Sequence, residues 1–525
     1  MLPKQKMKIY NTLTRQEEEL KSEEDKLVRV YSCGPTVYDF AHIGNLRKFV
    51  FDDLLVRTLK FLGNETKWVM NITDVGHLTG DRDMGEDKML VGAEREHKSA
   101  FEIAKHYEKV FFEDLKKLNV EKPDVTPRAT EHIQEQIDLV KKLEEKGFTY
   151  KTSDGIYFDT SKLSDYGKLA GLDVEGLKEG ARVEVNDEKK NPTDFALWKL
   201  SVPKGDHPEP AEGSNSVIAS EAKQSHRQME WPSPWGTGFP GWHLECSAMS
   251  IKYLGQPFEI HTGGIDLIPT HHTNEIAQSE AAYNKPLSKY WMHSEFVLQD
   301  GHKMAKSAGH FIRLQDIIDR GFDPLDFRYL CLSAHYRSKL NFTWESLEGA
   351  REARQKLRDF ALSQTPPRWG NTSSEVGRNG GEDFQFFTKS LENFSDYLSD
   401  DLNTPEAFAS VFQTINEANK TLSHLRGVED SSEVSVSEGR FIAAAKEFIS
   451  IIDQVLALNL SIELETEGGI KFEKGTPREV IELAKSRQKA RAEKDFTKAD
   501  ELRDKIEKSG YSVEDLQDVS LLKKS

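Results

Sequence analysis

The stretch Leu27–Thr73, LVRVYSCGPTVYDFAHIGNLRKFVFDDLLVRTLKFLGNETKWVMNIT, decides the fold of this chain. Its two ends, Leu27–Tyr31 and Lys67–Thr73, are rich in β-branched and aromatic residues and predict strands. Between them, apolar residues recur at helical spacing from Leu46 to Leu62. Strand, helix and strand in one short stretch indicate a βαβ unit, and therefore an α/β fold with a doubly wound parallel sheet. Ligands bind at the carboxyl ends of such strands, so the informative residues should lie between Ser32 and Asn45.

Length and composition describe a folded protein of several domains. At roughly 150 residues per domain, 525 residues predict about three domains. The 37% hydrophobic content excludes a disordered protein, and the lack of a long apolar run excludes a membrane span. The N-terminus lacks the apolar core of a signal peptide and three cysteines cannot form a disulfide framework, so we expect a cytoplasmic protein. With a net charge of −17, nucleic acid could be bound only through a local basic patch.

The rest of the chain divides by composition. Ser201–Gln228 and Ser363–Glu382 are rich in Pro, Gly, Ser and charged residues, which predicts loops. Amphipathic helices follow one another from Trp344 to Leu460, and a separate tail follows Gly475. We therefore predict a catalytic domain at 1–330 with an inserted α/β segment at about 125–240 and an extra loop at 201–228, a helical bundle at 331–465, and a small C-terminal domain at 475–525.

The tetrapeptide His42-Ile-Gly-Asn45 lies between the first predicted strand and the first predicted helix. A helix N-terminus offers unpaired N–H groups and a positive dipole, so phosphate is a natural ligand there. His42 can hydrogen-bond phosphate oxygens, and Gly44 lets a flat ligand approach the backbone. The alternative is that His42 and Asn45 only cap the helix, and these four residues alone favour neither interpretation.

A second motif, Lys303-Met-Ala-Lys-Ser307, follows an Asp-Gly turn signal and precedes Ala-Gly, which predicts a loop. Two mobile ammonium groups suit a polyphosphate that must be held during a reaction and then released. A lysine-rich loop on its own is more often simply solvated. The two motifs together, in this order, are much less expected by chance.

Together the two motifs resemble the signatures of class I aminoacyl-tRNA synthetases. The resemblance implies a Rossmann-like catalytic domain that binds ATP, accompanied by Mg²⁺, through Gly34, His42, Gly44, Asn45, Lys303 and Lys306. It also implies catalytic roles for His42 and Asn45 at the α-phosphate, and for Lys303 and Lys306 on the departing pyrophosphate. Asn45 stands where that family has a second histidine, which puts the rate rather than the reaction type in doubt. Ala305 replaces a serine, a change that touches neither lysine.

Two cysteines, a histidine and a glutamate form a candidate metal site. Cys33 ends the first predicted strand, and Cys246 lies in the segment GWHLECSAM. His271 and Glu275 stand four residues apart at a predicted helix start, so both can face one metal. Two thiolates, an imidazole and a carboxylate are a plausible tetrahedral zinc set. Chemistry alone favours two buried free cysteines and a capping histidine, because no CxxC occurs, and His272 is a second candidate ligand at i, i+3 from Glu275.

Three segments, CGPTVYD at 33–39, GWHLECSAM at 241–249 and HHTNE at 271–275, resemble the zinc-bearing motifs of the cysteinyl-tRNA synthetase family. The resemblance implies one Zn²⁺ per chain, held by Cys33, Cys246, His271 and Glu275, which binds the sulfur of the substrate cysteine. Zinc prefers thiolate to hydroxyl, so serine would be rejected without an editing domain. It further implies substrate contacts from four residues whose alternatives are packing and turn roles, namely Thr73, Trp242, His261 and Asp266.

The tail resembles the same family. Arg487–Asp504, RQKARAEKDFTKADELRD, is similar to its C-terminal helical motif, and a small basic excess after Lys471 makes RNA contact credible there. On charge alone, a solvated helix face is the favoured explanation. The resemblance predicts a monomeric cytoplasmic enzyme that uses ATP to join L-cysteine to tRNA(Cys) through cysteinyl-adenylate. The alternatives are a cysteine ligase of the mycothiol pathway, which would have no use for the helical module and tail, and a catalytically silent relative that binds RNA or zinc.

Overall fold

The computed structural model describes residues 6–22, 26–76, 88–171, 188–201, 228–303, 311–363, 384–427, 432–460, 464–515 and 520–524. The chain forms two compact units. The first comprises Met1–Arg354, Lys389–Gln413 and Gln454–Leu458, and the second comprises Gln355–Thr388, Thr414–Asp453 and Asn459–Ser525. The three-domain division at 1–330, 331–465 and 475–525 stays a prediction. The two predicted loops, apart from their outermost residues, lie outside the described part of the chain.

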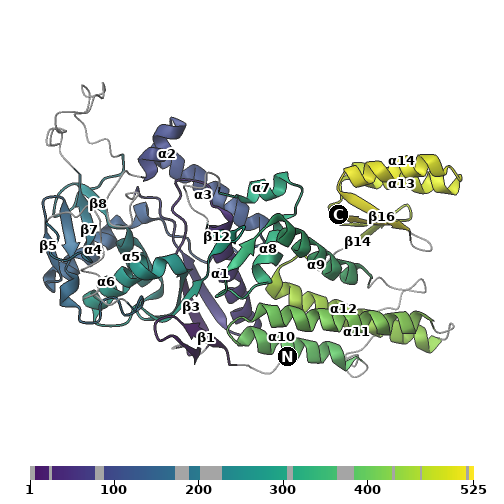
Figure 1. Cartoon of the computed structure of the whole chain (residues 1–525), viewed down its shortest axis with the longest axis horizontal. Helices are drawn as coiled ribbons and strands as arrows, with labels where there is room; N and C mark the ends of the chain where they lie inside the picture. The colour runs from purple at the N-terminus through teal and green to yellow at the C-terminus, as the bar shows by residue number, and fades with distance from the viewer. Residues whose placement is uncertain are drawn as a thin grey trace. The chain divides into compact units, whose positions relative to one another are not determined.

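The centre of the first unit is a parallel sheet in the order β10-β9-β3-β4, of which Figure 1 labels β3. Its strands are β3 (Leu27–Ser32), β4 (Glu65–Met70), β9 (Phe258–Gly264) and β10 (Ser288–Ser294). Helix α1 (Ile43–Phe61) connects β3 to its parallel neighbour β4. The predicted strand–helix–strand unit is therefore confirmed, and the carboxyl ends of β3 and β9 lie side by side.

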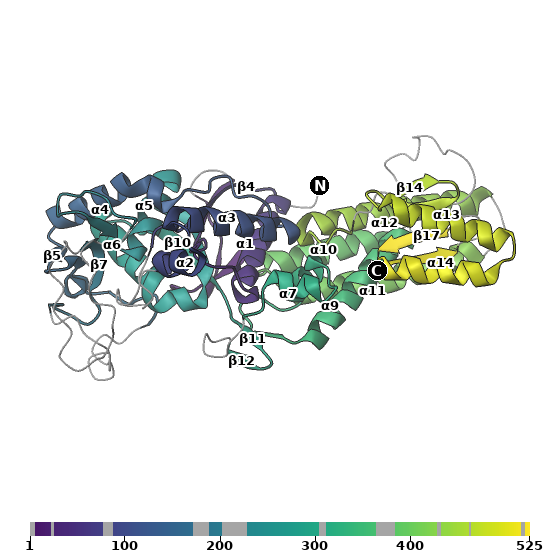
Figure 2. The same ribbon diagram turned by 90° about the horizontal axis from the view of Figure 1, so that it is seen from above.

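Helix α1 is buried on nearly all sides, because a second helix covers it. Phe49 of α1 meets Phe111 of α3 (Ala100–Lys117) edge to face, with ring centroids 4.8 Å apart, and Figure 2 shows the two helices side by side. A helix buried in this way must pair its charged groups internally. Lys48 accordingly pairs with Asp52 at 2.7 Å.

The inserted segment forms an antiparallel sheet in the order β5-β6-β7-β8. Its strands are β5 (Thr149–Lys151), β6 (Gly155–Phe158), β7 (Phe195–Leu200) and β8 (Gly238–Pro240). Three helices share one apolar core with this sheet: α4 (Ile133–Glu145), α5 (Trp242–Leu254) and α6 (Thr273–Tyr283). Because α5 and α6 also reach the central sheet, this core holds in place two helices that carry predicted site residues.

Besides parts of the later helices, the first unit contains further strands and helices. They are β1 (Lys8–Asn11), β2 (Gln16–Glu19), α2 (Lys88–Glu96), β11 (Val297–Gln299), β12 (His302–Lys303), α7 (Leu314–Asp319), α8 (Pro324–Leu332) and β13 (Leu340–Phe342). Arg328 of α8 is fully buried and donates to Asp53 at 2.5 Å and to the carbonyls of Leu118 and Leu456 at 3.0 and 2.7 Å. One guanidinium thus joins three segments that are distant in the sequence.

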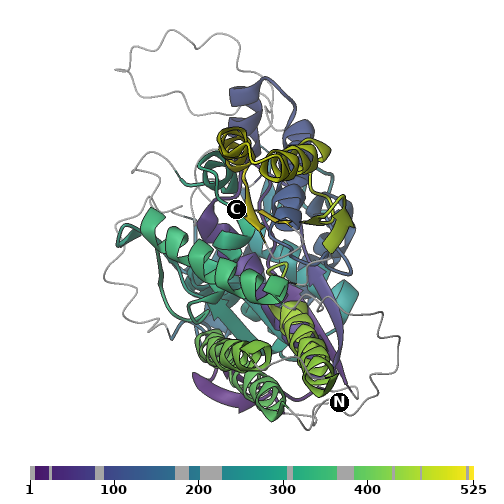
Figure 3. The same ribbon diagram turned by 90° about the vertical axis from the view of Figure 1, so that its right-hand side faces the viewer.

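The second unit combines long helices with a small α/β layer. Parts of α9 (Trp344–Ser363), α10 (Gln385–Ser399), α11 (Thr404–Gly427) and α12 (Ser432–Leu456) belong to it. Its mixed sheet, in the order β14-β15-β17-β16, comprises Leu464–Glu467, Ile470–Glu473, Ser520–Lys524 and Tyr511–Asp515. Helices α13 (Arg478–Ala492) and α14 (Phe496–Lys508) pack on this sheet and lie beside each other, seen nearly end-on in Figure 3. In the described part of the chain, no helix is long and apolar enough to cross a membrane.

Candidate metal centre and nucleotide site

The structure brings together the four predicted metal ligands from four different elements. Cys33 follows β3 directly, Cys246 lies on α5, His271 lies in the short π-helix Ile268–His272, and Glu275 lies in the first turn of α6. All four are buried, and their ligand atoms lie within 4.8 Å of one another. They form a possible metal-binding cluster, which we call the thiol cluster.

The distances within the thiol cluster fit a tetrahedral zinc ion. Bonds of about 2.3 Å to sulfur and about 2.0–2.2 Å to nitrogen or oxygen place tetrahedral ligand atoms roughly 3.3–3.8 Å apart. The Sγ atoms of Cys33 and Cys246 are 3.9 Å apart, and Cys33 Sγ lies 3.7 Å from Glu275 Oε1. His271 Nε2 lies 3.1 Å from that same oxygen. Both the donor set and its spacing therefore suit Zn²⁺.

A second histidine orients the His271 ring. The Nδ1 of His243 lies 3.0 Å from the Nδ1 of His271, so one of the two rings carries the shared proton. Trp242 covers His271, with ring centroids 4.3 Å apart. Metal-binding histidines typically donate the N–H of their other ring nitrogen to an acceptor, and His243 offers one here. His243 precedes Cys246 by three residues on one helix, so helical spacing was a signal that could have identified it.

Burial and mutual charge set the protonation of the cluster. Burial raises the pKa of the Cys33 thiol well above its usual value, and its contact with Cys246 adds to this. Burial also opposes ionisation of Cys246, but hydrogen bonds with Cys33 and His271 outweigh it and bring the pKa of Cys246 to about 7. Burial would lower the pKa of His271, but the Glu275 carboxylate raises it to about 10. Protons and a metal ion therefore compete for the same donor atoms.

His272, the second candidate ligand from the sequence, also approaches the thiol cluster. Its Nε2 lies 3.2 Å from Cys33 Sγ, and together with Cys33, His261 and Glu275 it forms a second compact donor group. His272 Nδ1 lies 2.7 Å from Nε2 of His293, whose Nδ1 lies 2.8 Å from the Thr12 hydroxyl. The i, i+3 and i, i+4 spacings thus bring both histidines to the same carboxylate.

Two residues that were not predicted support this arrangement. Lys48, buried in α1, donates to the Cys33 carbonyl at 2.6 Å and so holds the backbone at the end of β3. His293 lies on β10, a different element from those that carry the four residues of the thiol cluster. Neither residue carries a local sequence signal, because each acts through a contact that only the folded chain creates.

The backbone after Cys33 is held against β4. A Cβ on Gly34 would lie 1.6 Å from the Asn71 carbonyl oxygen, so only glycine fits there. The Gly34 N–H donates to the Asn71 side chain at 2.8 Å, and that side chain donates to the Thr73 hydroxyl at 3.1 Å. Thr73 in turn donates to Glu245 at 3.0 Å. Burial raises the pKa of Glu245 to about 8 despite this hydrogen bond. This network joins the segments that carry the two cysteines.

The other predicted substrate contacts lie around the cluster at different depths. Thr73 is 2% exposed and His261 is fully buried, with its Nε2 at 3.0 Å from Glu275 Oε2 and its ring stacked on Trp291. Trp242 is half-buried at the start of α5. Asp266 is exposed in the 3₁₀ turn Ile265–Leu267, which joins β9 to the segment with His271.

His42 caps α1 in the structure. Its Nδ1 accepts from the N–H groups of Gly44 and Asn45 at 3.1 and 3.3 Å, while the Asn45 side chain accepts from the His42 N–H at 3.2 Å. This is a complete capping box, so both residues do cap the helix, whereas a contact of His42 or Asn45 with phosphate stays a prediction. Capping also leaves the imidazole proton on Nε2, since Nδ1 is an acceptor. Burial lowers the pKa of His42 to about 4, which keeps the ring neutral.

The second predicted motif is described only in part. The backbone of Lys303 lies in β12, which pairs with β11. Lys306 and Ser307 lie outside the described residues. Their roles therefore stay predictions.

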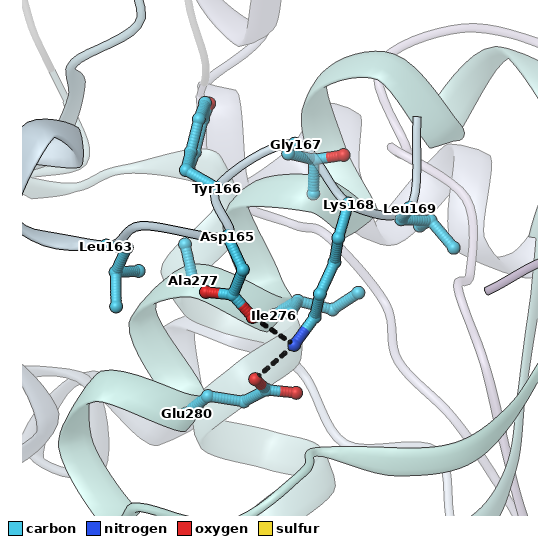
Figure 4. A pocket seen from close by; sticks show the side chains of 10 residues that line it. Leu163, Asp165, Tyr166, Gly167, Lys168, Leu169, Ile276, Ala277 and Glu280 are labelled. Atoms are coloured by element: carbon cyan, nitrogen blue, oxygen red, sulfur yellow. Dashed lines mark hydrogen bonds and ion pairs between the residues drawn. The ribbon is translucent and has the colours of Figure 1, made fainter. Parts of the chain in front are cut away.

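A small cavity lies beside α6, bordered by Leu163–Leu169 (Figure 4). Lys168 crosses it to pair with Asp165 at 2.9 Å and with Glu280 of α6 at 2.6 Å. Its volume of about 10 Å³ holds one water at most. These ion pairs connect the segment 163–169 to α6, the helix that carries the predicted ligand Glu275, and the cavity is too small for a substrate.

Models of known protein families match almost the whole chain. The model of the class I (C) tRNA synthetase catalytic domain matches residues 19–212 and 217–352. A DALR domain model matches 393–460, and the model of the cysteinyl-tRNA ligase anticodon binding domain matches 473–519.

Curated relatives match over nearly their full length. The cysteine–tRNA ligase of Treponema denticola is 40% identical over 528 residues, which cover 97% of this chain and 98% of the relative. Cysteine–tRNA ligase 1 of Burkholderia lata is 44% identical over 489 residues, covering 93% and 90%. A structure of Mycobacterium tuberculosis methionyl-tRNA synthetase with methionyl-adenylate matches 82% of this chain and 92% of its own, with a TM-score of 0.56 at 13% identity. The predicted class I synthetase fold is confirmed, and the chain belongs to the cysteinyl-tRNA synthetase family.

Proposed function

We propose that this chain activates L-cysteine with ATP and transfers it to tRNA(Cys). The observation that carries the proposal is the thiol cluster, buried at the carboxyl end of the central sheet near the capped N-terminus of α1. Groups that select a thiol thus lie near a helix end suited to phosphate. The curated relatives of the full chain are named cysteine–tRNA ligases, which supports the same activity here.

In the first step, the carboxylate of cysteine attacks the α-phosphorus of ATP in line. The phosphorus–oxygen bond to the β-phosphate breaks, giving cysteinyl-adenylate and pyrophosphate. The neutral His42 ring donates its Nε2 proton in a hydrogen bond to an α-phosphate oxygen, because Nδ1 is occupied by the helix cap. The N-terminus of α1 adds its positive dipole. Lys303 and Lys306 would neutralise the departing pyrophosphate, and Mg²⁺ accompanying ATP would supply further positive charge on the phosphates.

The thiol cluster provides the selection for cysteine. Cys33, Cys246, His271 and Glu275 would hold one Zn²⁺, which supplies a Lewis-acidic partner for a substrate thiolate. Serine offers only a protonated hydroxyl, which is a poor zinc ligand. Thr73, Trp242, His261 and Asp266 line the amino-acid site, with Thr73 oriented by its hydrogen bond to Glu245.

In the second step, a terminal hydroxyl of tRNA attacks the acyl carbon and AMP leaves. The match to an anticodon binding domain at 473–519 supports tRNA contact through α13, α14 and their sheet. We propose that the helices at 331–465 contact tRNA as well, and that the enzyme acts as a monomer in the cytoplasm. Basic side chains on the tail would contact phosphates, so tRNA affinity should fall as salt rises.

Pyrophosphate exchange into ATP tests the first step. We expect exchange that depends on cysteine, proceeds without tRNA and excludes serine, together with about one zinc per chain. Equal exchange with serine, or full selectivity at much lower zinc content, would contradict the proposal. Formation of cysteinyl-tRNA separates it from an amino-sugar ligase, which would show exchange alone. A silent relative would show neither reaction.

A further inference from the structure

The segment that follows the second signature packs on the first. Phe311–Arg313 are the first described residues after Lys303. The backbones of His42 and Arg313 form an antiparallel bridge, and the Ile43 N–H donates to the Ile312 carbonyl at 2.9 Å. The Ile312 side chain is 6% exposed, so an apolar anchor accompanies these backbone contacts. The first motif and the segment 311–313, far apart in the sequence, are thereby joined at the start of α1.

Aromatic contacts reinforce this junction. The ring of Phe311 stacks on the imidazole of His42, with centroids 4.8 Å apart and planes at 17°. The Arg313 guanidinium lies 4.9 Å from the centroid of Phe40, just before the first signature. Face-to-face contact of this kind restricts rotation of the smaller ring about its Cβ–Cγ bond.

The His42 ring is therefore held in two ways. Its Nδ1 edge is fixed by the N–H groups of Gly44 and Asn45, and its face is fixed by Phe311. The cap alone defines which ring nitrogen faces the helix N–H groups, but hydrogen bonds to one ring edge still permit the ring to tilt. The stacked phenyl ring removes that freedom, so the direction of Nε2 is set by both contacts.

We propose that Phe311 is a positioning residue that acts through His42, aiming the Nε2 proton at the phosphate of ATP. This inference rests on the proposed function, since it assigns His42 a donor role in adenylation. Phe311 itself does not contact the reacting atoms. The simpler role for Phe311, apolar packing that supports the chain locally, makes different predictions.

The test compares Phe311→Leu with Phe311→Trp in cysteine-dependent pyrophosphate exchange. Leucine keeps an apolar side chain but offers no ring face, whereas tryptophan restores one. We expect Phe311→Leu to lower kcat about 2- to 12-fold, the change that corresponds to one aromatic pair. The KM for cysteine and the zinc content should not change, and Phe311→Trp should recover most of the rate. The matched control is Phe322→Leu, because Phe322 stacks on Trp344 in the same unit rather than on His42, and its loss should leave kcat unchanged.

A double-mutant cycle decides whether Phe311 acts through His42. In a His42→Asn background, Phe311→Leu should lower the rate by less than twofold, since no imidazole remains to be oriented. The same loss in both backgrounds, a rate for Phe311→Trp as low as for Phe311→Leu, or no difference from Phe322→Leu would overturn the inference. Failure of the proposed function is distinct, because wild-type enzyme would then show no cysteine-dependent exchange at all.

Discussion

Replacing His243 with leucine should weaken zinc binding although no proposed zinc ligand is altered. When His271 binds a metal through Nε2, its Nδ1 carries a proton that His243 accepts across 3.0 Å. Leucine is apolar and similar in size, so it fills the 2% exposed position without accepting that hydrogen bond. The His271 N–H would then be buried without its partner, and the ring would lose one of the contacts that orient it.

The magnitude follows from this geometry. Loss of such an outer partner typically costs about 10- to 100-fold in metal affinity, or roughly 1.4–2.7 kcal/mol. We expect the upper half of that range, because His271 is itself 2% exposed and water cannot easily replace the lost acceptor. Competition against a coloured zinc chelator measures the dissociation constant directly.

His132→Leu is the matched control for this prediction. His132 is 3% exposed and also makes two hydrogen bonds, to the Arg128 carbonyl at 2.6 Å and to Tyr253 at 2.8 Å, but it lies outside the thiol cluster. Both variants should lose a similar amount of folding stability, while only His243→Leu loses zinc affinity and discrimination against serine. Wild-type zinc affinity in His243→Leu, or an equal loss in the control, would refute the reasoning.

Four further predictions concern other parts of the chain. Lys306→Ala should cut pyrophosphate exchange severely while zinc content stays constant, because its charge is needed mainly in the transition state; near-normal exchange would show that the motif is misassigned. Phe496→Ala should weaken aminoacylation but spare exchange, because this aromatic side chain on α14 is 62% exposed and can stack on a base of bound tRNA; equal loss of both activities would indicate a structural role. Burial lowers the pKa of His42 to about 4, so the stability that its neutral ring provides is complete above pH 6.5 and is lost as the pH falls towards 4. In denaturant titrations, a His42→Gln variant should therefore lose less unfolding free energy than the wild type between pH 6.5 and pH 4. Arg328→Met should lower the free energy of unfolding by about 3 kcal/mol, the low end for a broken buried ion pair, because Arg57 still neutralises Asp53; an unchanged melting temperature would contradict this.

Much of the fold was predictable because its signals are local. The strands around Leu27 and Lys67 and the helix between them follow from side-chain periodicity within one stretch, and the parallel pairing follows from the crossover helix. The structural bounds differ from the predicted ones by a few residues. Helix α1 begins at Ile43, three residues earlier than the apolar pattern, because the His42 capping box extends it.

The candidate site was predictable only in part. His271 and Glu275 share a helix face by spacing, and the two cysteines were recognised through the family resemblance rather than through their positions. The i, i+4 rule could not exclude His272, and the structure places its Nε2 at 3.2 Å from Cys33. The orienting partner His293 and the lysine that holds the Cys33 carbonyl, Lys48, were not anticipated.

By itself, the sequence determined the class of fold, the family and the residues that carry charge or a thiol. Those properties depend on residue type and on the spacing of apolar residues every two to four positions, which can be seen within one short stretch of sequence. Only the tertiary structure decided which atoms meet: that the Cys33 and Cys246 sulfurs lie 3.9 Å apart, and that Phe311 stacks on His42. These contacts join segments that are far apart in the sequence, and separation along the chain does not indicate how close two segments lie in space. They arise because burying the central sheet and the shared core of α5 and α6 brings the ends of several elements to one point.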